Sequence, residues 1–318
     1  EDENSFEFDL FGLPLPTAET RNVFEETTYT AAVNHTVSHG DLTWRYGIEG
    51  GWIDAYQSQA YTNLLPPPLD LLPSTFEEAE DSSTVGRIYV DVLHEFSANL
   101  RAEYALFGSY IDSDGSDLSR LEPRVGVAWS PVEGHWLRGG FMRSSLDLNT
   151  PTLSPIGILG LQPNQISVTT TGYVDTYAFR WDAEWTPDFF TAVEYQHQDL
   201  QDPQIPVPLS SIPFTTSRGR IDRASLSSNL LLGHGFGLSS TVAYADSEDQ
   251  STNSLTSGEL LPFIPQWSGQ VALTWVNQAN LRATLAANYV GHRNNESGIE
   301  LDDFWTLDAS VTWEPIDK

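Results

Sequence analysis

Arginine and carboxylate side chains recur at alternate positions of several segments, and this spacing could serve two purposes. In 176–186, Arg180, Asp182 and Glu184 fall on one side of an extended chain, because successive side chains of a strand point to opposite faces. Rings of such charges set selectivity in channels, whereas cross-strand ion pairs brace a sheet. Both interpretations stay open. The residues that we expect on this charged face are Arg45, Glu49, Arg87, Asp91, Glu95, Arg101, Glu103, Arg124, Arg138, Arg180, Asp182, Glu184, Glu194, Arg282 and Asp308.

Four acidic clusters, at 77–81, 112–117, 246–249 and 300–303, raise the question of calcium. Hard cations take several oxygen ligands from clustered carboxylates. In the second cluster the glycine, Gly115, comes too early for an EF-hand loop. We therefore interpret these clusters as solvated loop charge and predict no metal site.

Other chemistry has little support in the sequence. The seven histidines are scattered, and no local motif nominates a nucleophile, so we predict neither an enzyme nor a cofactor. The net charge of -29, from 44 acidic and 15 basic residues, excludes nucleic acid as a partner because phosphate binding needs a basic surface. The absence of cysteine excludes disulfides and thiolate metal sites.

The segments that must position the charged side chains alternate apolar and polar residues over about ten positions. In 176–186 the other face carries Tyr177, Phe179, Trp181 and Trp185, which is typical of a strand with two different environments. No run approaches the 18 apolar residues of a membrane helix. The fourteen strands that we predict lie at 5–13, 26–37, 42–52, 86–96, 100–110, 121–130, 135–144, 176–186, 189–198, 218–232, 236–246, 266–275, 281–289 and 304–313.

The gaps between these strands alternate strictly between tight reversals and long acidic loops. Bacterial outer-membrane barrels have this asymmetry, with short periplasmic turns and longer extracellular loops. Aromatic residues also sit at the ends of the apolar faces, as in the girdles of such barrels. A soluble β-sandwich is the alternative, since it too alternates. The long gaps are 54–84, 112–120, 145–175, 199–217, 246–265 and 292–303.

We therefore predict an all-β protein: one transmembrane antiparallel up-and-down β-barrel over 1–318, in the outer membrane. Its charged face lines the lumen, its long loops are extracellular, and the even strand count puts both termini in the periplasm. The apolar, proline-rich content of 54–84 and 145–175 favours packing, either as a constriction in the barrel mouth or as a surface for a partner.

Two stretches resemble the barrel of TonB-dependent outer-membrane receptors. The first is Leu121-Glu122-Pro123-Arg124-Val125-Gly126-Val127-Ala128-Trp129-Ser130-Pro131 followed by Leu137-Arg138-Gly139-Gly140-Phe141. The second covers 262–313 and includes Asn288-Tyr289-Val290-Gly291. A closer likeness is to barrels fused behind periplasmic tetratricopeptide repeats, as in exopolysaccharide exporters. The resemblance implies transport across the outer membrane.

The sequence also departs from that family. It has neither a plug domain nor a TonB box, and Glu314-Pro315-Ile316-Asp317-Lys318 lacks the usual terminal aromatic, so we expect sixteen strands if a terminal pair is missing. We expect outer-membrane lipid as a partner, together with a periplasmic partner or an N-terminal domain outside this chain. An export pore and a non-conducting barrel that displays its loops for adhesion or assembly remain alternatives. The oligomeric state and the substrate are not readable.

Overall fold

The computed structural model describes residues 2–8, 18–64, 74–113, 116–145, 152, 154–163, 169–205, 207, 213–252, 256–277 and 280–313. The chain forms two compact units, which we describe separately. The first comprises Glu1–Asn34, Gly47–Ile88 and Gly108–Arg120, and the second comprises His35–Tyr46, Tyr89–Phe107 and Leu121–Lys318. Within the described residues no helix has the length and hydropathy needed to cross a membrane.

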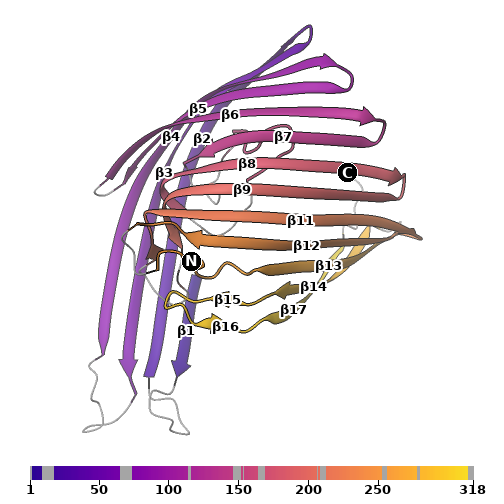
Figure 1. Ribbon diagram of the computed structural model, residues 1–318. Helices are drawn as coiled ribbons and strands as arrows, with labels where there is room; N and C mark the ends of the chain where they lie inside the picture. The colour runs from indigo at the N-terminus through magenta and orange to yellow at the C-terminus, as the bar shows by residue number, and fades with distance from the viewer. Residues whose placement is uncertain are drawn as a thin grey trace. The chain divides into compact units, whose positions relative to one another are not determined.

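The described residues form one large antiparallel sheet whose strands follow each other in chain order (Figure 1). The order is β1-β2-β3-β4-β5-β6-β7-β8-β9-β11-β12-β13-β14-β17, with β10 beside β9 and a separate β15-β16 pair. The strands are β1 (Asp2–Phe8), β2 (Ala18–His39), β3 (Leu42–Asn63), β4 (Thr75–Ser97), β5 (Leu100–Ser113), β6 (Ser116–Val132), β7 (His135–Ser144), β8 (Thr169–Thr186), β9 (Phe189–Ile205), β10 (Phe214–Thr215), β11 (Arg218–Gly233), β12 (Phe236–Asp249), β13 (Trp267–Val276), β14 (Leu281–Val290), β15 (Arg293–Asn294), β16 (Glu300–Leu301) and β17 (Phe304–Trp313).

The predicted all-β antiparallel class is confirmed, and each predicted strand overlaps one of the fourteen long strands. The strand lengths were underestimated. β3 continues to Asn63 and β4 begins at Thr75, so most of the predicted loop 54–84 is strand. The extension of β3 mixes Tyr, Gln, Ser and Thr, and the extension of β4 is rich in Glu and Asp, so neither has an apolar face for the alternation to reveal. Two further two-residue strands, β15 and β16, lie in the predicted loop 292–303.

The first strand differs in position from its prediction. β1 covers Asp2–Phe8 rather than 5–13, and 9–13 lie outside the described residues. Its ladder pairs Asp2 with Phe24, which is fifteen residues before the end of β2 at His39. Asp2 therefore lies beside the part of β2 near Phe24, and the placement of both termini in the periplasm stays a prediction.

The sheet has two unlike faces in the second unit. We call the face of Arg138, Arg180 and Glu194, which lie opposite one another on β7, β8 and β9, the polar face. The other side, the apolar face, leaves Tyr177 and Phe179 about half exposed, at 49% and 51%. Soluble monomers rarely expose apolar surface on this scale.

Aromatic pairs mark both ends of the apolar face. Phe236 lies against Trp275 at a ring-centroid distance of 6.2 Å, and Tyr244 lies against Trp267 at 5.0 Å. The two pairs are eight residues apart on β12, which is about 27 Å along a strand. This spacing matches an apolar band of about 25 Å between aromatic girdles.

Candidate functional site

The segment 154–163, from the long gap after β7, folds back against the polar face. Its tip is a tight hairpin in which Ile158 N donates to Leu161 O at 2.9 Å and Leu161 N donates to Ile158 O at 2.8 Å. The two turn residues, Leu159 and Gly160, have φ of 48° and 80°. Positive φ at both central positions is the geometry of a type I′ turn, and glycine adopts it without strain.

Two facing glycines form the seat of this hairpin. Gly126 of β6 lies opposite Gly140 of β7, with both on the polar face. A Cβ added at Gly126 would meet Ile158 at 3.2 Å, and one at Gly140 would meet Leu161 at 3.1 Å. Ile158 and Leu161 are 1% and 0% exposed there, packed with Met142 and Ala178. The glycines of the strand pair that resembles receptor barrels therefore make room for the loop.

Side chains of the sheet hold the hairpin by its backbone. Arg124 donates to the carbonyl oxygens of Pro155 at 2.6 Å and Ile156 at 2.8 Å. Arg138 donates to the carbonyl oxygen of Leu159 at 2.6 Å. Because a guanidinium presents several fixed donors, one arginine can bind two carbonyls at once.

Two further side chains complete the attachment. Glu103 accepts the N–H of Leu159 at 2.6 Å, and Gln196 donates to the carbonyl oxygen of Gln162 at 2.7 Å. Glu103 is 4% and Gln196 2% exposed. The loop is thus held on the polar face by β5, β6, β7 and β9 together.

The same charged residues pair with one another. Arg45 binds both Asp91, at 2.5 Å, and Glu103. Arg138 lies 2.9 Å from Asp182, and Arg180 lies 2.8 Å from that same carboxylate. Arg180 also pairs with Glu194 at 3.2 Å. Separately, Arg101 pairs with Glu95 at 3.1 Å. Several of these side chains therefore pair across strands and also contact the loop, and their role in selectivity stays a prediction.

Five other predicted residues belong to β3, β4, β8, β14 and β17. Glu49 and Arg87 are buried, and Arg87 lies 3.3 Å from the Ser109 hydroxyl. Glu184 is exposed near the end of β8. Arg282 forms no ion pair with a described residue, and Asp308 accepts a hydrogen bond from Asn288.

Sequence reasoning missed three buried residues beside Arg124. Its guanidinium lies 3.9 Å from the ring centroid of Phe107, which stacks on Tyr89 at 5.2 Å. Glu122, with 0% exposure, lies 3.5 Å from the Arg124 guanidinium. Their spacing could have revealed two of them. Tyr89 is two residues from both Arg87 and Asp91, and Phe107 is four residues from Glu103, so each aromatic falls on the same face of its strand as the charged residues. Cation–π contact explains why aromatics stand on a charged face.

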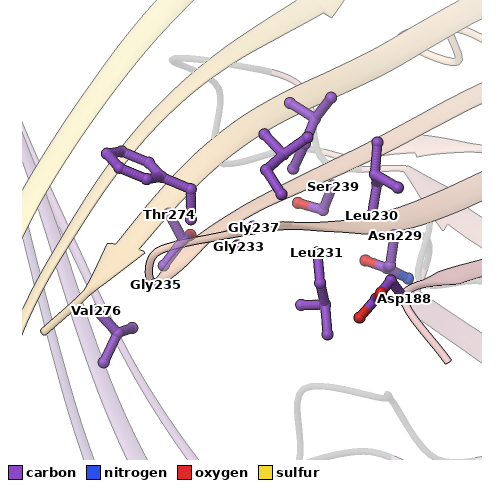
Figure 2. A pocket seen from close by; sticks show the side chains of 13 residues that line it. Asp188, Asn229, Leu230, Leu231, Gly233, Gly235, Gly237, Ser239, Thr274 and Val276 are labelled. Atoms are coloured by element: carbon purple, nitrogen blue, oxygen red, sulfur yellow. The ribbon is translucent and has the colours of Figure 1, made fainter.

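A pocket of about 400 Å³ lies beside the hairpin. Its lining includes Arg45, Arg101, Glu103, Trp136 and Arg138 together with the turn of the loop. A second pocket, of about 740 Å³, lies at the short turns of β9, β11 and β12 (Figure 2). The second is lined mainly by leucine, glycine and valine, so the charged chemistry belongs to the first.

In the acidic cluster at 246–249, the most buried carboxylate is hydrogen-bonded to side chains of the protein itself. Asp249, 1% exposed, accepts from the hydroxyls of Thr216 at 2.5 Å and Thr256 at 2.6 Å. It lies five residues beyond Tyr244, outside the apolar band. Burial acts to raise the pKa of Asp249, but hydrogen bonds from Thr216, Thr256 and Ser251 prevail and lower it to about 2. No group of three or more metal-binding side chains occurs in the described ranges.

Comparison with known proteins decides the family. The model of the family described as "TonB dependent receptor-like, beta-barrel" matches residues 2–318. The chain belongs to this family. The resemblance seen in the sequence is confirmed, and the family places this TonB-dependent-receptor-like barrel in the outer membrane. None of the curated proteins compared matches it.

Solved structures share the fold of this receptor-like barrel. The ferric yersiniabactin uptake receptor FyuA from Yersinia pestis is 11% identical, with a TM-score of 0.63 over 95% of this chain and 49% of its own. The siderophore receptor PiuA from Acinetobacter baumannii is 10% identical, with a TM-score of 0.60 over 98% and 57%. The copper transporter OprC is 12% identical, with a TM-score of 0.60 over 96% and 51%. The chain spans about half the length of these proteins.

Proposed function

We propose that this protein carries a solute across the outer membrane through the interior of its barrel, and that the hairpin at 154–163 narrows the path. The observation that carries the proposal is the position of the hairpin, which five side-chain hydrogen bonds hold on the polar face. In a closed barrel the polar face turns inward and the apolar face meets lipid. The predicted charged residues then line the lumen.

The orientation of the hairpin in the membrane follows from the lengths of the loops. Long loops of outer-membrane barrels face the outside and short turns face the periplasm. The hairpin enters from the long-gap end of β7 and reaches Arg138, six residues before Ser144. That is a descent of about 20 Å along the strand. A solute that enters from outside meets the hairpin first and then the charged pocket with Arg45, Glu103 and Arg138.

The test is single-channel conductance in planar bilayers. Gly126→Val places a branched side chain where Ile158 now lies 3.2 Å from the added Cβ, so the hairpin loses its seat. We expect a severalfold higher conductance than in the unmodified protein. Gly139→Val is the matched control, because its Cβ lies on the other face with Ala178 O at 4.0 Å as the nearest atom. It should leave the conductance unchanged.

Two outcomes would count against the proposal. Equal conductance for the Gly126 and Gly139 variants would remove the hairpin from the path. No current from any folded variant at any voltage would favour the non-conducting alternative, in which the barrel displays its loops for adhesion or assembly.

A further inference from the structure

The pocket of about 400 Å³ beside the hairpin has more positive than negative side chains in its lining. Among the described residues that line it are three arginines, Arg45, Arg101 and Arg138, and a single carboxylate, Glu103. In a chain with 44 acidic and only 15 basic residues, this is a local reversal of charge. The volume lies within the range of about 300–1,000 Å³ that is usual for small-molecule sites.

The one carboxylate of the lining is fully engaged by the protein. Oε1 of Glu103 accepts a hydrogen bond from Arg45, and Oε2 accepts the N–H of Leu159 at 2.6 Å. A cation in the pocket would therefore have to displace Arg45 or the hairpin turn to reach this carboxylate. The pocket does not favour a cationic ligand.

The three guanidinium groups, in contrast, have terminal N–H groups without an acceptor. Arg45 forms its hydrogen bonds through Nη2 and Arg138 through Nη1, whereas Arg101 contacts a carboxylate through Nε. Within the described ranges, no hydrogen bond uses Nη1 of Arg45, Nη2 of Arg138 or either Nη atom of Arg101. The side chains are 36%, 27% and 42% exposed, so a ligand can reach them. Guanidinium donors match carboxylate and phosphate oxygens.

Apolar side chains complete the pocket. Ala128, Leu159 and Leu161 line it together with Trp136. The Arg101 guanidinium lies 5.4 Å from the centroid of the Trp136 ring, which brings one of the available cations next to the indole. An apolar lining with a few placed polar groups is typical of ligand pockets.

We propose that this pocket binds a small organic anion. Its carboxylate or phosphate group bonds to the unused donors of Arg45, Arg101 and Arg138, and its apolar part lies against Trp136. Arg101 and Trp136 are each the second residue of their strands, β5 and β7, so the site lies between the hairpin and the short turns. The binding site depends only on the pocket, and the step that makes this anion the transported solute rests on the proposed function.

Isothermal titration calorimetry of the purified protein in detergent tests the site, with benzoate and phenyl phosphate as probes. Both should bind. Benzamide, which has the shape of benzoate without its charge, should bind at least about tenfold more weakly. Tighter binding of phenyl phosphate than of benzoate would assign a phosphate-bearing ligand, and the reverse order would assign a carboxylate.

Arg101→Gln locates the charge that binds the anion. Arg101 does not hold the hairpin, and its substitution should raise the dissociation constant for benzoate at least about tenfold. Arg282→Gln is the matched control, because it removes the same charge from β14, outside the lining of the pocket. It should leave the dissociation constant unchanged. Heat-modifiable gel migration shows that both variants are folded.

Three calorimetric results would overturn the proposal. The first is an equal affinity for benzoate in the two folded variants, and the second is an equal affinity for benzoate and benzamide. The third is the absence of binding by either anion at millimolar concentration.

The position of the anion can be read from tryptophan fluorescence. Saturation with 4-bromobenzoate should quench part of the fluorescence of the unmodified protein, because the bromine lies beside the Trp136 ring. Trp136→Phe should abolish this loss. Quenching of equal size in Trp136→Phe would place the anion elsewhere and contradict the assignment.

These readouts are independent of conductance. Benzoate binding by a protein that never conducts would retain the anion site and remove the transport proposal. Conductance that depends on the hairpin, in a protein that binds neither anion, would retain transport and remove the site. The two failures are thus distinguishable.

Discussion

At the scale of single residues, Arg124 has two tasks. It binds two carbonyls of the hairpin and also neutralises the buried carboxylate of Glu122. Hydrogen bonds to a charged group contribute about 1.5–3 kcal/mol each, and an unpaired buried carboxylate adds a further penalty. Arg124 is therefore the side chain on which the loop depends most.

Replacing Arg124 tests this dependence. Arg124→Gln should weaken hairpin docking by about 3 kcal/mol, which corresponds to roughly hundredfold faster hydrogen exchange at the amides of Ile158 and Leu161. Arg124→Lys is the control, because it keeps a cation beside Glu122 but lacks the fork that binds two carbonyls. It should give an intermediate rate. Unchanged protection in Arg124→Gln would mean that the glycine seat alone holds the loop.

Asp249 gives the loop after β12 a dependence on pH. Its folded pKa of about 2 lies below the ordinary 3.8. The carboxylate therefore contributes stability that is present above about pH 4 and is lost as the pH falls toward 2, about 2 kcal/mol in all. Limited proteolysis should cut 250–259 faster as the pH falls through this window. Asp249→Asn should be cut fast at neutral pH and change little on acidification; an acid-sensitive Asn variant would assign the effect to another group.

The alternation of the sequence predicted which residues share the polar face, because a strand has a period of two. It could not predict which of them meet. Arg45 finds Asp91 and Glu103 on different strands, and that match depends on register and strand twist rather than on local pattern. Ion pairs across a sheet join residues that are far apart in the chain, so the local pattern of a single sequence cannot predict them.

At the scale of elements, the hairpin turn is the most constrained part of the loop. Gly160 has φ of 80°, and a Cβ there would collide with the Arg138 guanidinium. Gly160→Ala should therefore destabilise docking by at least about 1 kcal/mol. Protease sensitivity of 154–163 measures this. Leu159→Asn, which suits positive φ, should leave the sensitivity close to that of the unmodified protein; equal sensitivity of both variants would show that turn strain does not control docking.

For loop 145–175 the sequence predicted packing but not the docking site. Its apolar, proline-containing sequence favoured packing, and the hairpin is packed. The sequence did not predict where the hairpin docks. Gly126 and Gly140 are ordinary small strand residues unless their contacts with Ile158 and Leu161 are known. The extensions of β3 to Asn63 and of β4 from Thr75 were missed for another reason, since a strand that is polar on both faces has no apolar period.

At the scale of the whole molecule, tryptophan positions test the placement in the membrane. Tryptophans mark both ends of the apolar face, as Trp267 and Trp275 do on β13. Amphipathic rings prefer the headgroup level. Lipids brominated near the headgroup should therefore quench the fluorescence more than lipids brominated at mid-chain.

The matched control for this experiment is Trp136→Phe. Trp136 lies on the polar face and lines the charged pocket, so its loss should not alter the ratio of shallow to deep quenching. Equal quenching by both lipids in the unmodified protein would contradict the girdle assignment.

The hydrogen bonds that hold the hairpin all go to its backbone. Arg124, Arg138, Glu103 and Gln196 contact carbonyl oxygens and one N–H group, none of which changes when a side chain is replaced. Selection should then act unevenly during evolution. Among related barrels the anchoring residues and the glycines of the seat should be retained together, while the loop between them drifts wherever its shape permits. If the barrel carries a solute as proposed, a change of solute requires substitutions only in the loop, with the sheet left untouched.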